Sequence, residues 1–579
     1  MNAPAHFDLR NVNALWGGVL AETLVRCGVT HAVVSPGSRS TPLTIALARQ
    51  PGIAAVPVLD ERSAAFFALG LAKRTGRPTV LVCTSGTAGA NYFPAVIEAQ
   101  ESRVPLLVIT ADRPPELRAC GSGQTIDQLN LFGGHVEFFH ELALPEASAE
   151  RLGYLRQTIS HACARAVEAP GPVHLNAPFR NPLPPLPDDG ATTALGAAIY
   201  WEQFFAGMAP AARAVLVGEP IGVATGVHGV IVVGPMASRD AATDVRLVGQ
   251  IAAQLGWPVL ADGLTPLRRH ASAVPNLVTG YDLVLRHAAT AERLRPEVVL
   301  CLGEWPTSKT LRAWLEASDA PVWFVSDRVD NRDALHLRTR PVRMSLAALP
   351  AALPQAADEN GYTRMWLRYD ERVRVARDER MRTMAAMFEG KAAWLLGQHL
   401  PKGTAVFVAN SMPVRDAEFF WPPGDRGGEV FFNRGANGID GTLSTALGLA
   451  HDAGRPAVLL TGDLALLHDT NGFLLRPKLR GALTIVLINN RGGGIFEHLP
   501  VAQFEPPFEE FFATPQDMDF AKLCATYGVE HVPVRDWPHF VELVSALPAS
   551  GMRVLELRTD RKADAALRKR LFAEIAAEL

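Results

Sequence analysis

Residues 457–492 indicate the fold most clearly, and their sequence is AVLLTGDLALLHDTNGFLLRPKLRGALTIVLINNRG. It contains two apolar runs, AVLLTG and LTIVLINN; the first leads into Asp463 and the second ends at Asn490. Apolar runs that end in Gly, Asp or Asn are typical of buried strands in a parallel sheet. The residues between them suffice for one helix and a return strand. A right-handed crossover would place both strand ends at the same edge of the sheet.

At that edge, Asp463 and Asn490 would offer a carboxylate and an amide oxygen to one cation. Mg²⁺ prefers oxygen ligands and usually takes some of them from phosphates. Gly492 offers a backbone carbonyl and, lacking a side chain, lets a diphosphate approach. Taken separately, Asp463 as a helix cap and the asparagines as a turn remain alternatives. Together they predict a site for a metal ion and a diphosphate.

The same alternation of apolar strands and helices runs through the whole chain, which predicts an α/β protein with three doubly wound parallel-sheet domains. The proline-rich segment at 180–190 cannot lie inside a helix or a central strand, and a second candidate linker lies at 349–361. We therefore expect domains at 1–184, 185–358 and 359–579. The expected strands are HAVVSPG (31–37), TVLVCTSG (79–86), PLLVITAD (105–112), GVIVVGP (229–235), EVVLCLGE (297–304), VWFVSD (322–327) and AVFVANS (405–411). A charged helical pattern follows the second linker, from Tyr362 to about Leu400.

Composition excludes several classes of function. The formal net charge of −3 gives no reason to expect a nucleic-acid partner. Neither a secretory signal nor an apolar run long enough to span a bilayer is visible, so a cytoplasmic location without membrane insertion is expected. The six cysteines have no paired spacing, which favours reduced and mostly buried thiols.

A second signal lies in the first block, where Glu61 follows the strand AAVPVL (54–59) and Asp60 at the start of an apolar helix. In thiamine diphosphate-dependent enzymes, which this segment resembles, a partly desolvated glutamate at such a place shares a proton with a weakly basic ring nitrogen of the cofactor. The alternative is an acidic residue that only favours the helix N-terminus. The predicted metal–diphosphate site favours a contact between Glu61 and a cofactor.

Seven segments together resemble a family of thiamine diphosphate (ThDP)-dependent synthases that acts in menaquinone biosynthesis. They are SPGSRSTPLTIAL (35–47), DERSAAFFALGLAKRTGRP (60–78), TSGTAGANYFPAVIEA (84–99), ITADRPPELR (109–118), NSMPVRD (410–416), NRGANGIDGTLSTALG (433–448) and NNRGGGIF (489–496). The resemblance is specific in the two end blocks and thin across 186–360.

The resemblance implies a pyrimidine-binding domain, a central domain and a domain that binds diphosphate and Mg²⁺, or alternatively Mn²⁺. It implies decarboxylation of 2-oxoglutarate and conjugate (Stetter-like) addition of the succinyl-semialdehyde carbanion to isochorismate. It also implies a homodimer or a dimer of dimers, with active sites at the subunit interface. Two alternatives remain: a related ThDP-dependent decarboxylase or carboligase, such as an acetohydroxyacid synthase-like enzyme, and a non-catalytic ThDP-fold binding protein.

The resemblance also assigns individual residues. The expected catalytic residues are Glu61 and Gln124. Substrate contacts are expected from Ser38, Arg39, Lys309, Arg415, Arg434 and Phe496. Arginine binds carboxylates bidentately, which suits two dicarboxylate substrates. Cofactor contacts are expected from Glu61, Ser411, Ile439, Gly462, Asp463, Asn490 and Ile495, and metal contacts from Asp463, Asn490 and Gly492. The chain departs from the family pattern at Gly123, Thr310 and Leu464.

Overall fold

The structure is a computed structural model that describes residues 3–223, 226–238, 240–354 and 361–579. The chain divides into two compact units. Unit 1 consists of Met1–Ala214, Asn433–Ala453 and His468–Arg480, and unit 2 consists of Val215–Phe432, Gly454–Leu467 and Gly481–Leu579. Unit 1 therefore combines the first block with two segments of the third.

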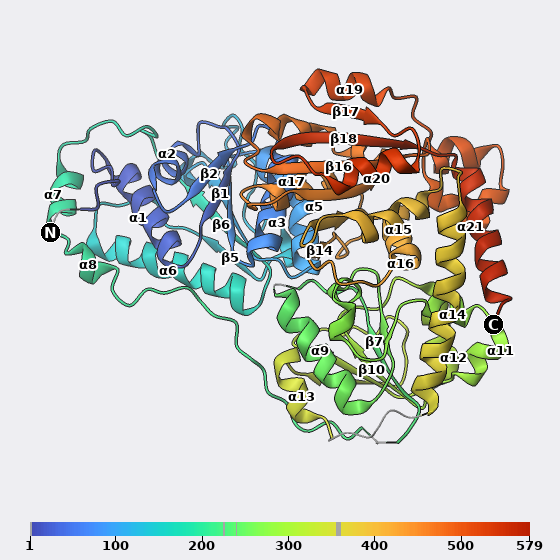
Figure 1. Cartoon of the computed structure of the whole chain (residues 1–579). Helices are drawn as coiled ribbons and strands as arrows, with labels where there is room; N and C mark the ends of the chain where they lie inside the picture. The colour runs from blue at the N-terminus through green and yellow to red at the C-terminus, as the bar shows by residue number, and fades with distance from the viewer. Residues whose placement is uncertain (1–2, 224–225, 239, 355–360) are drawn as a thin grey trace. The chain divides into compact units, whose positions relative to one another are not determined.

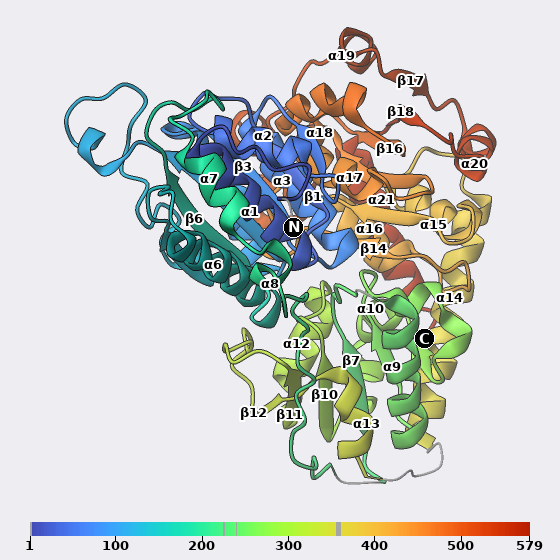
Figure 2. The same ribbon diagram turned by 90° about the vertical axis from the view of Figure 1, so that its left-hand side faces the viewer.

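Unit 1 is built on one six-stranded parallel sheet in the order β2-β1-β3-β4-β6-β5. Its strands are β1 (His31–Val34), β2 (Ala54–Pro57), β3 (Thr79–Cys83), β4 (Leu106–Asp112), β5 (Phe138–Glu141) and β6 (Pro172–Pro178). Its helices are α1 (Val12–Arg26), α2 (Thr41–Arg49), α3 (Glu61–Thr75), α4 (Thr87–Asn91), α5 (Phe93–Glu101), α6 (Ala149–Glu168), α7 (Ala191–Ala198), α8 (Trp201–Phe204) and α17 (Thr442–Ala450). Figures 1 and 2 show α1 and α6 together on one face of this sheet, with α3 on the other.

Helices α3 and α17 of unit 1 cross at two glycines. A Cβ at Gly70 would lie 2.1 Å from the carbonyl oxygen of Thr445, and a Cβ at Gly448 would lie 2.1 Å from that of Phe67. Only glycine leaves room for so close a backbone approach. This crossing fixes α3, the helix that begins with Glu61.

Unit 2 contains two further six-stranded parallel sheets, in the orders β12-β11-β10-β7-β8-β9 and β14-β13-β15-β16-β18-β17. The central sheet has β7 (Gly229–Val233), β8 (Val259–Ala261), β9 (Leu277–Val278), β10 (Val298–Leu302), β11 (Val322–Ser326) and β12 (Thr339–Arg343). The C-terminal sheet has β13 (Ala405–Val408), β14 (Val430–Phe431), β15 (Ala457–Gly462), β16 (Ala482–Asn489), β17 (Glu530–Pro533) and β18 (Gly551–Arg558).

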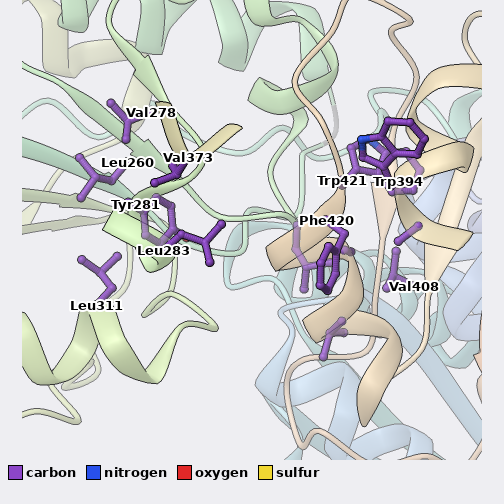
Figure 3. Close-up of a cluster of buried hydrophobic side chains, with 14 of the residues drawn as sticks. Leu260, Val278, Tyr281, Leu283, Leu311, Val373, Trp394, Val408, Phe420 and Trp421 are labelled. Carbon is purple, nitrogen blue, oxygen red and sulfur yellow. The ribbon is translucent and has the colours of Figure 1, made fainter. Parts of the chain in front are cut away.

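The helices around the central sheet are α9 (Ala241–Leu255), α10 (Tyr281–Leu285), α11 (Ala288–Arg293), α12 (Lys309–Ser318) and α13 (Leu349–Ala352). The remaining helices are α14 (Gly361–Thr383), α15 (Glu389–His399), α16 (Met412–Phe420), α18 (Asp463–His468), α19 (Phe520–Tyr527), α20 (Trp537–Ser545) and α21 (Arg561–Ala576). One buried apolar cluster joins residues of both sheets of unit 2. Figure 3 shows part of it, from Leu260 and Val278 to Phe420 and Trp421.

The first and the C-terminal sheets have the same strand order, counted along the chain within each sheet. In both sheets, the second strand along the chain lies on one side of the first, and the third strand lies on its other side. The direction in which strands are added therefore reverses between the first and the third strand. In open α/β sheets, ligands bind beyond the carboxyl ends of the strands at such a reversal. The candidate residues after β1, β13 and β15 therefore stand at the expected places.

The predicted α/β class with three parallel sheets is confirmed, and all the strands expected from the sequence are present. Five of the six free cysteines are buried, and Cys120 is exposed. In the described ranges, no helix has both the length and the apolarity to cross a membrane. The predicted linker at 180–190 lacks helix and strand. In the second linker, α13 occupies 349–352, and 355–360 lie outside the described residues.

The prediction of one continuous helical stretch from Tyr362 to about Leu400 is wrong. Helix α14 ends at Thr383 and α15 begins at Glu389, because Phe388 has an extended backbone and a fully buried side chain. Side chains from elsewhere stabilise the break. Trp537 donates to the carbonyl oxygen of Ala386 at 3.1 Å, and Asp564 accepts from the backbone N–H of Glu389 at 2.9 Å. These contacts outweigh the helix propensity of the local sequence.

Candidate active site

Strands β15 and β16 of unit 2 are parallel neighbours, with Gly462 opposite Ile488. Asp463 and Asn490 therefore follow these strands at one edge of the sheet, as predicted. The crossover between the strands differs from the single helix that was expected, since it consists of α18 and a 3₁₀ segment, η6 (Thr470–Lys478). His468 is the last residue of α18, and Asp469 directly precedes η6 without a side-chain capping bond.

The carboxylate of Asp463 is buried and held by backbone groups. One oxygen accepts from the N–H of Leu464 at 2.8 Å and the other from the N–H of Gly492 at 2.9 Å. Burial raises the pKa of Asp463 to about 6, against the lowering effect of these hydrogen bonds. A cation beside the carboxylate would offset that burial. Leu464 fits where the family pattern has glycine, because it is an ordinary helical residue with negative φ.

The side-chain amide of Asn490 is buried, and its two ends differ. Its Nδ2 donates to Oε1 of Glu389 at 2.7 Å, whereas its Oδ1 has no hydrogen-bond partner in the described structure. A buried oxygen without a partner costs about 1–3 kcal/mol. An orphaned amide oxygen near a buried carboxylate is the donor set that a hard cation requires. These residues therefore fit a Mg²⁺ ion.

The glycine loop after Asn490 is tightly packed. Gly492 has a φ of +136°, and a Cβ there would lie 2.3 Å from the carbonyl oxygen of Ala513. Any other residue at 492 would displace the loop from the Asp463 carboxylate. Ile495 and Phe496 follow in a 3₁₀ turn, η7 (Gly494–His498), where the ring of Phe496 packs edge-on against that of Phe512.

The first turn of α16, after β13, contributes two more predicted residues of unit 2. Ser411 has a φ of +72°, which is uncommon for a residue with a side chain, and such strain gathers at functional sites. Its carbonyl oxygen accepts a hydrogen bond from Nη1 of Arg415 at 2.5 Å. Lys309 lies instead in the central block, as the exposed first residue of α12.

In unit 1, Glu61 is the first residue of α3, and Asp60 caps the helix by accepting from Ser63 N–H at 3.1 Å. A second interaction holds the cap, because Asn471 donates to the other Asp60 oxygen at 2.6 Å. In the described residues, the half-buried carboxylate of Glu61 itself forms no hydrogen bond or ion pair. It is therefore available to a ligand.

Two arginines gather at the strand ends of unit 1. The pKa of Arg39 is lowered by burial and then by the nearby guanidinium of Arg113. Arg39 donates to the carbonyl oxygen of Phe179 at 3.0 Å, but its buried Nε has no partner in the described structure. Two guanidinium groups with an unused buried donor could bind a carboxylate. Ser38, next to Arg39, is exposed.

Arg113 also connects to Gln124. It donates to the hydroxyl of Ser85 and to the carbonyl oxygen of Gly123, each at 2.7 Å, and Gln124 Nε2 donates to the carbonyl oxygen of Ser85 at 3.1 Å. Sequence reasoning assigned no role to Arg113. The available signal was its position directly after the strand PLLVITAD, the same kind of position that identified Arg39.

The loop with Arg434 and Ile439 also belongs to unit 1. Glu98 fastens it by accepting from the backbone N–H groups of Gly435 and Ala436, at 3.1 and 2.7 Å. The loop adjoins a cavity of about 200 Å³ lined by Phe66, Pro94, Ile97, Glu98, Asn433, Ala436, Gly438 and Asp440. Ile439 is half-buried, so it is not an ordinary core residue.

The structure thus places the predicted residues in two groups. Unit 1 carries Ser38, Arg39, Glu61, Gln124, Arg434 and Ile439. Unit 2 carries Lys309, Ser411, Arg415, Gly462, Asp463, Asn490, Gly492, Ile495 and Phe496.

Comparison with known proteins identifies the family of the chain. Three family models match: the N-terminal TPP binding domain of thiamine pyrophosphate enzymes at residues 16–131, the middle domain at 211–408 and the C-terminal TPP binding domain at 421–557. A crystal structure from Mycobacterium smegmatis, described as a thiamin diphosphate-dependent enzyme, has the same fold, with a TM-score of 0.67 at 18% identity. It covers 95% of this chain and 99% of that one.

Curated relatives are similar along nearly the whole length. The chain is 51% identical over 576 residues to a 2-succinyl-5-enolpyruvyl-6-hydroxy-3-cyclohexene-1-carboxylate (SEPHCHC) synthase of Trichormus variabilis, covering 98% of this chain and 99% of the relative. It is also 51% identical over 558 residues to the synthase of that name from Microcystis aeruginosa, covering 96% and 97%. With its three thiamine pyrophosphate enzyme domains, the chain therefore belongs to the SEPHCHC synthase family.

Proposed function

We propose that this protein decarboxylates 2-oxoglutarate and adds the remaining four-carbon unit to isochorismate in a conjugate (Stetter-like) sense, which yields SEPHCHC and CO₂ in menaquinone biosynthesis. The observation that carries the proposal is the pairing of the buried Asp463 carboxylate with the unpartnered Asn490 oxygen at adjacent strand ends. The name of the family supports the product, and the sequence resemblance implies the two substrates.

The cofactors in this proposal are ThDP and a divalent metal, Mg²⁺ or Mn²⁺. Asp463, Asn490 and the carbonyl of Gly492 would hold the metal. Gly462, Ser411, Ile439 and Ile495 would contact the cofactor. Bound ThDP supplies an electron sink for the carbon that loses CO₂.

The catalytic group in this proposal is Glu61. Its carboxylate would hold a proton shared with the cofactor's aminopyrimidine ring, a role that suits an acid without protein partners at a helix start. Gln124 would stand beside the reacting carbon, fixed there by Ser85 and Arg113.

The substrates in this proposal are both dicarboxylates, and the arginines supply their recognition. Arg39, Arg415 and Arg434 would bind carboxylates, together with Ser38, Lys309 and Phe496. The buried Nε of Arg39 supports this role, because an arginine fork binds a carboxylate through parallel N–H bonds. We add Arg113 to this set on its proximity to Arg39.

The domain boundaries at 184/185 and 358/359 belong to the same proposal, as do a cytoplasmic location and a homodimer or dimer of dimers with active sites at the subunit interface. In that assembly, the first block of one subunit and the third block of another would contribute to each site.

The proposal is tested by cofactor titration followed by CO₂ release. Circular dichroism should change when ThDP and Mg²⁺ are added together. Release of CO₂ should then be measurable with 2-oxoglutarate and far slower with pyruvate, the substrate that an acetohydroxyacid synthase-like enzyme would prefer. A preference for pyruvate would overturn the assignment of substrate, and absence of any cofactor response would overturn the assignment of cofactor.

A further inference from the structure

Glu389, the first residue of α15, is a buried carboxylate that the proposed chemistry does not use. Its side chain is 2% exposed, and in the described structure no lysine or arginine pairs with it. Its Oε1 accepts two hydrogen bonds, from Asn490 Nδ2 at 2.7 Å and from Thr559 Oγ1 at 3.2 Å. Burying an acidic group without a direct ion pair costs several kcal/mol. A buried acidic group with this cost is expected at a position where the group has a function.

The partner of Glu389 suggests that function. An amide presents a donor at one end and an acceptor at the other, and its neighbours decide which end points where. Glu389 takes the donor end of Asn490, which leaves Oδ1 turned away and without a partner. Gly494 leaves room for that donor end, since a Cβ there would lie 2.7 Å from Asn490 Nδ2.

Glu389 is itself rigidly held. Its backbone N–H donates to Asp564 Oδ2 at 2.9 Å. Asp564 is in turn fixed by Arg568, whose Nη2 donates to Asp564 Oδ1 at 3.1 Å and to Asp416 Oδ1 at 2.6 Å. Arg568 and these two aspartates are almost fully buried. The start of α15 is thus tied to α16 and α21, two helices of the same unit.

We propose that Glu389 is a positioning residue that locks the Asn490 amide with its oxygen directed at the metal ion. The inference rests on the proposed metal site formed by Asp463, Asn490 and Gly492. The location of the acceptor atom matters in this role more than the charge of the carboxylate does. Groups that orient metal ligands in this way typically contribute about 10- to 100-fold to metal affinity.

Two conservative variants separate the position of the acceptor oxygen from the presence of an ionisable group. Glu389→Asp keeps the carboxyl group but withdraws the acceptor by one methylene, whereas Glu389→Gln keeps an acceptor oxygen in place but removes the ionisable group. Thr559→Val is the matched control, because it removes the other hydrogen bond to the same Oε1 atom. Mg²⁺ is titrated into each full-length protein at constant ThDP, and bound ThDP is quantified after equilibrium dialysis.

The Mg²⁺ concentration for half-maximal ThDP binding should rise about tenfold or more in Glu389→Asp. It should stay within about threefold of wild type in Glu389→Gln and Thr559→Val. An Asp variant that behaves like wild type would overturn the inference, as would a Gln variant as impaired as the Asp variant. Melting temperatures without Mg²⁺ show whether each variant is folded. If ThDP binding to the wild-type protein does not depend on Mg²⁺, the proposed metal site itself would be refuted.

Discussion

At the scale of single residues, Glu61 and Asp463 illustrate two ways in which a carboxylate becomes available to a ligand. Asp463 is buried and bonded by backbone N–H groups, and its pKa is raised. Glu61 is half-buried at a helix start and has no hydrogen-bond or ion-pair partner among the described residues. The first suits a permanent metal ligand, and the second suits a group that exchanges a proton.

Glu61→Gln should separate cofactor binding from cofactor activation. The amide keeps the volume and one hydrogen-bonding oxygen but cannot take up the proton. Exchange of the thiazolium proton of bound ThDP for deuterium, followed by NMR after acid quench, should slow by about 10²–10⁴-fold, while ThDP binding weakens only modestly. Exchange at the wild-type rate would reduce Glu61 to a helix-start residue.

Arg415→Ala should impair substrate use without unfolding the protein. Loss of a charge-assisted hydrogen bond of about 1.5–3 kcal/mol corresponds to a Michaelis constant raised about 10- to 100-fold for at least one substrate. The matched control is Arg455→Ala, because the Arg455 side chain of the same unit is 54% exposed and 4.0 Å from its acidic partner. Equal, unchanged Michaelis constants in both variants would remove Arg415 from the substrate site.

Asp469 offers a test of pH dependence. It is fully buried, and burial raises its pKa to about 7 although Ser444 donates to it. An acid with a raised folded-state pKa binds a proton in the folded state that the unfolded state has lost. Stability therefore falls as pH rises from about 4 to 7, by up to about 1.4 kcal/mol per pH unit.

Asp469→Asn imitates the protonated acid and should remove this dependence. The melting temperature of the variant minus that of the wild type should increase as pH rises from 5 to 7.5. A difference between the two that stays constant over this range would show that Asp469 does not titrate there.

At the scale of secondary-structure elements, the crossing of α3 and α17 depends on Gly70 and Gly448. Gly70→Ala should destabilise unit 1 by about 1–3 kcal/mol, because the new methyl group would meet a backbone carbonyl that cannot move freely. Thermal unfolding followed by circular dichroism measures the effect. Gly153→Ala is the control: Gly153 lies within α6 with nothing near its Cβ position, so alanine there should be neutral or stabilising. Similar losses in both variants would contradict the role assigned to the crossing.

Strands and their polar ends could be predicted from the sequence, because a buried parallel strand is a local apolar run and its end is a local change in composition. Asp463, Asn490 and Arg39 were found in this way. The break between α14 and α15 could not be predicted, since Trp537 and Asp564 stabilise it from far along the chain. Glu389 escaped notice for the same reason, as it lies 101 residues from Asn490.

At the scale of the whole molecule, two of the three sheets share one strand order although the sequence shows no short-period repeat. Strand order records the path of the crossovers, which the apolar pattern of each strand does not encode. Both of these sheets carry predicted functional residues beyond their carboxyl edges, whereas the central sheet, with a different order, has only Lys309 nearby.

In the proposed function, the chain joins two dicarboxylates by a cofactor-dependent reaction. The most direct measurement incubates the protein with 2-oxoglutarate, isochorismate, ThDP and Mg²⁺ and follows the products by mass spectrometry, with each component omitted in turn. We expect an adduct with the mass of both substrates less one CO₂, formed only in the complete mixture. A folded, cofactor-loaded protein that releases CO₂ from 2-oxoglutarate but never forms this adduct would contradict the proposed function.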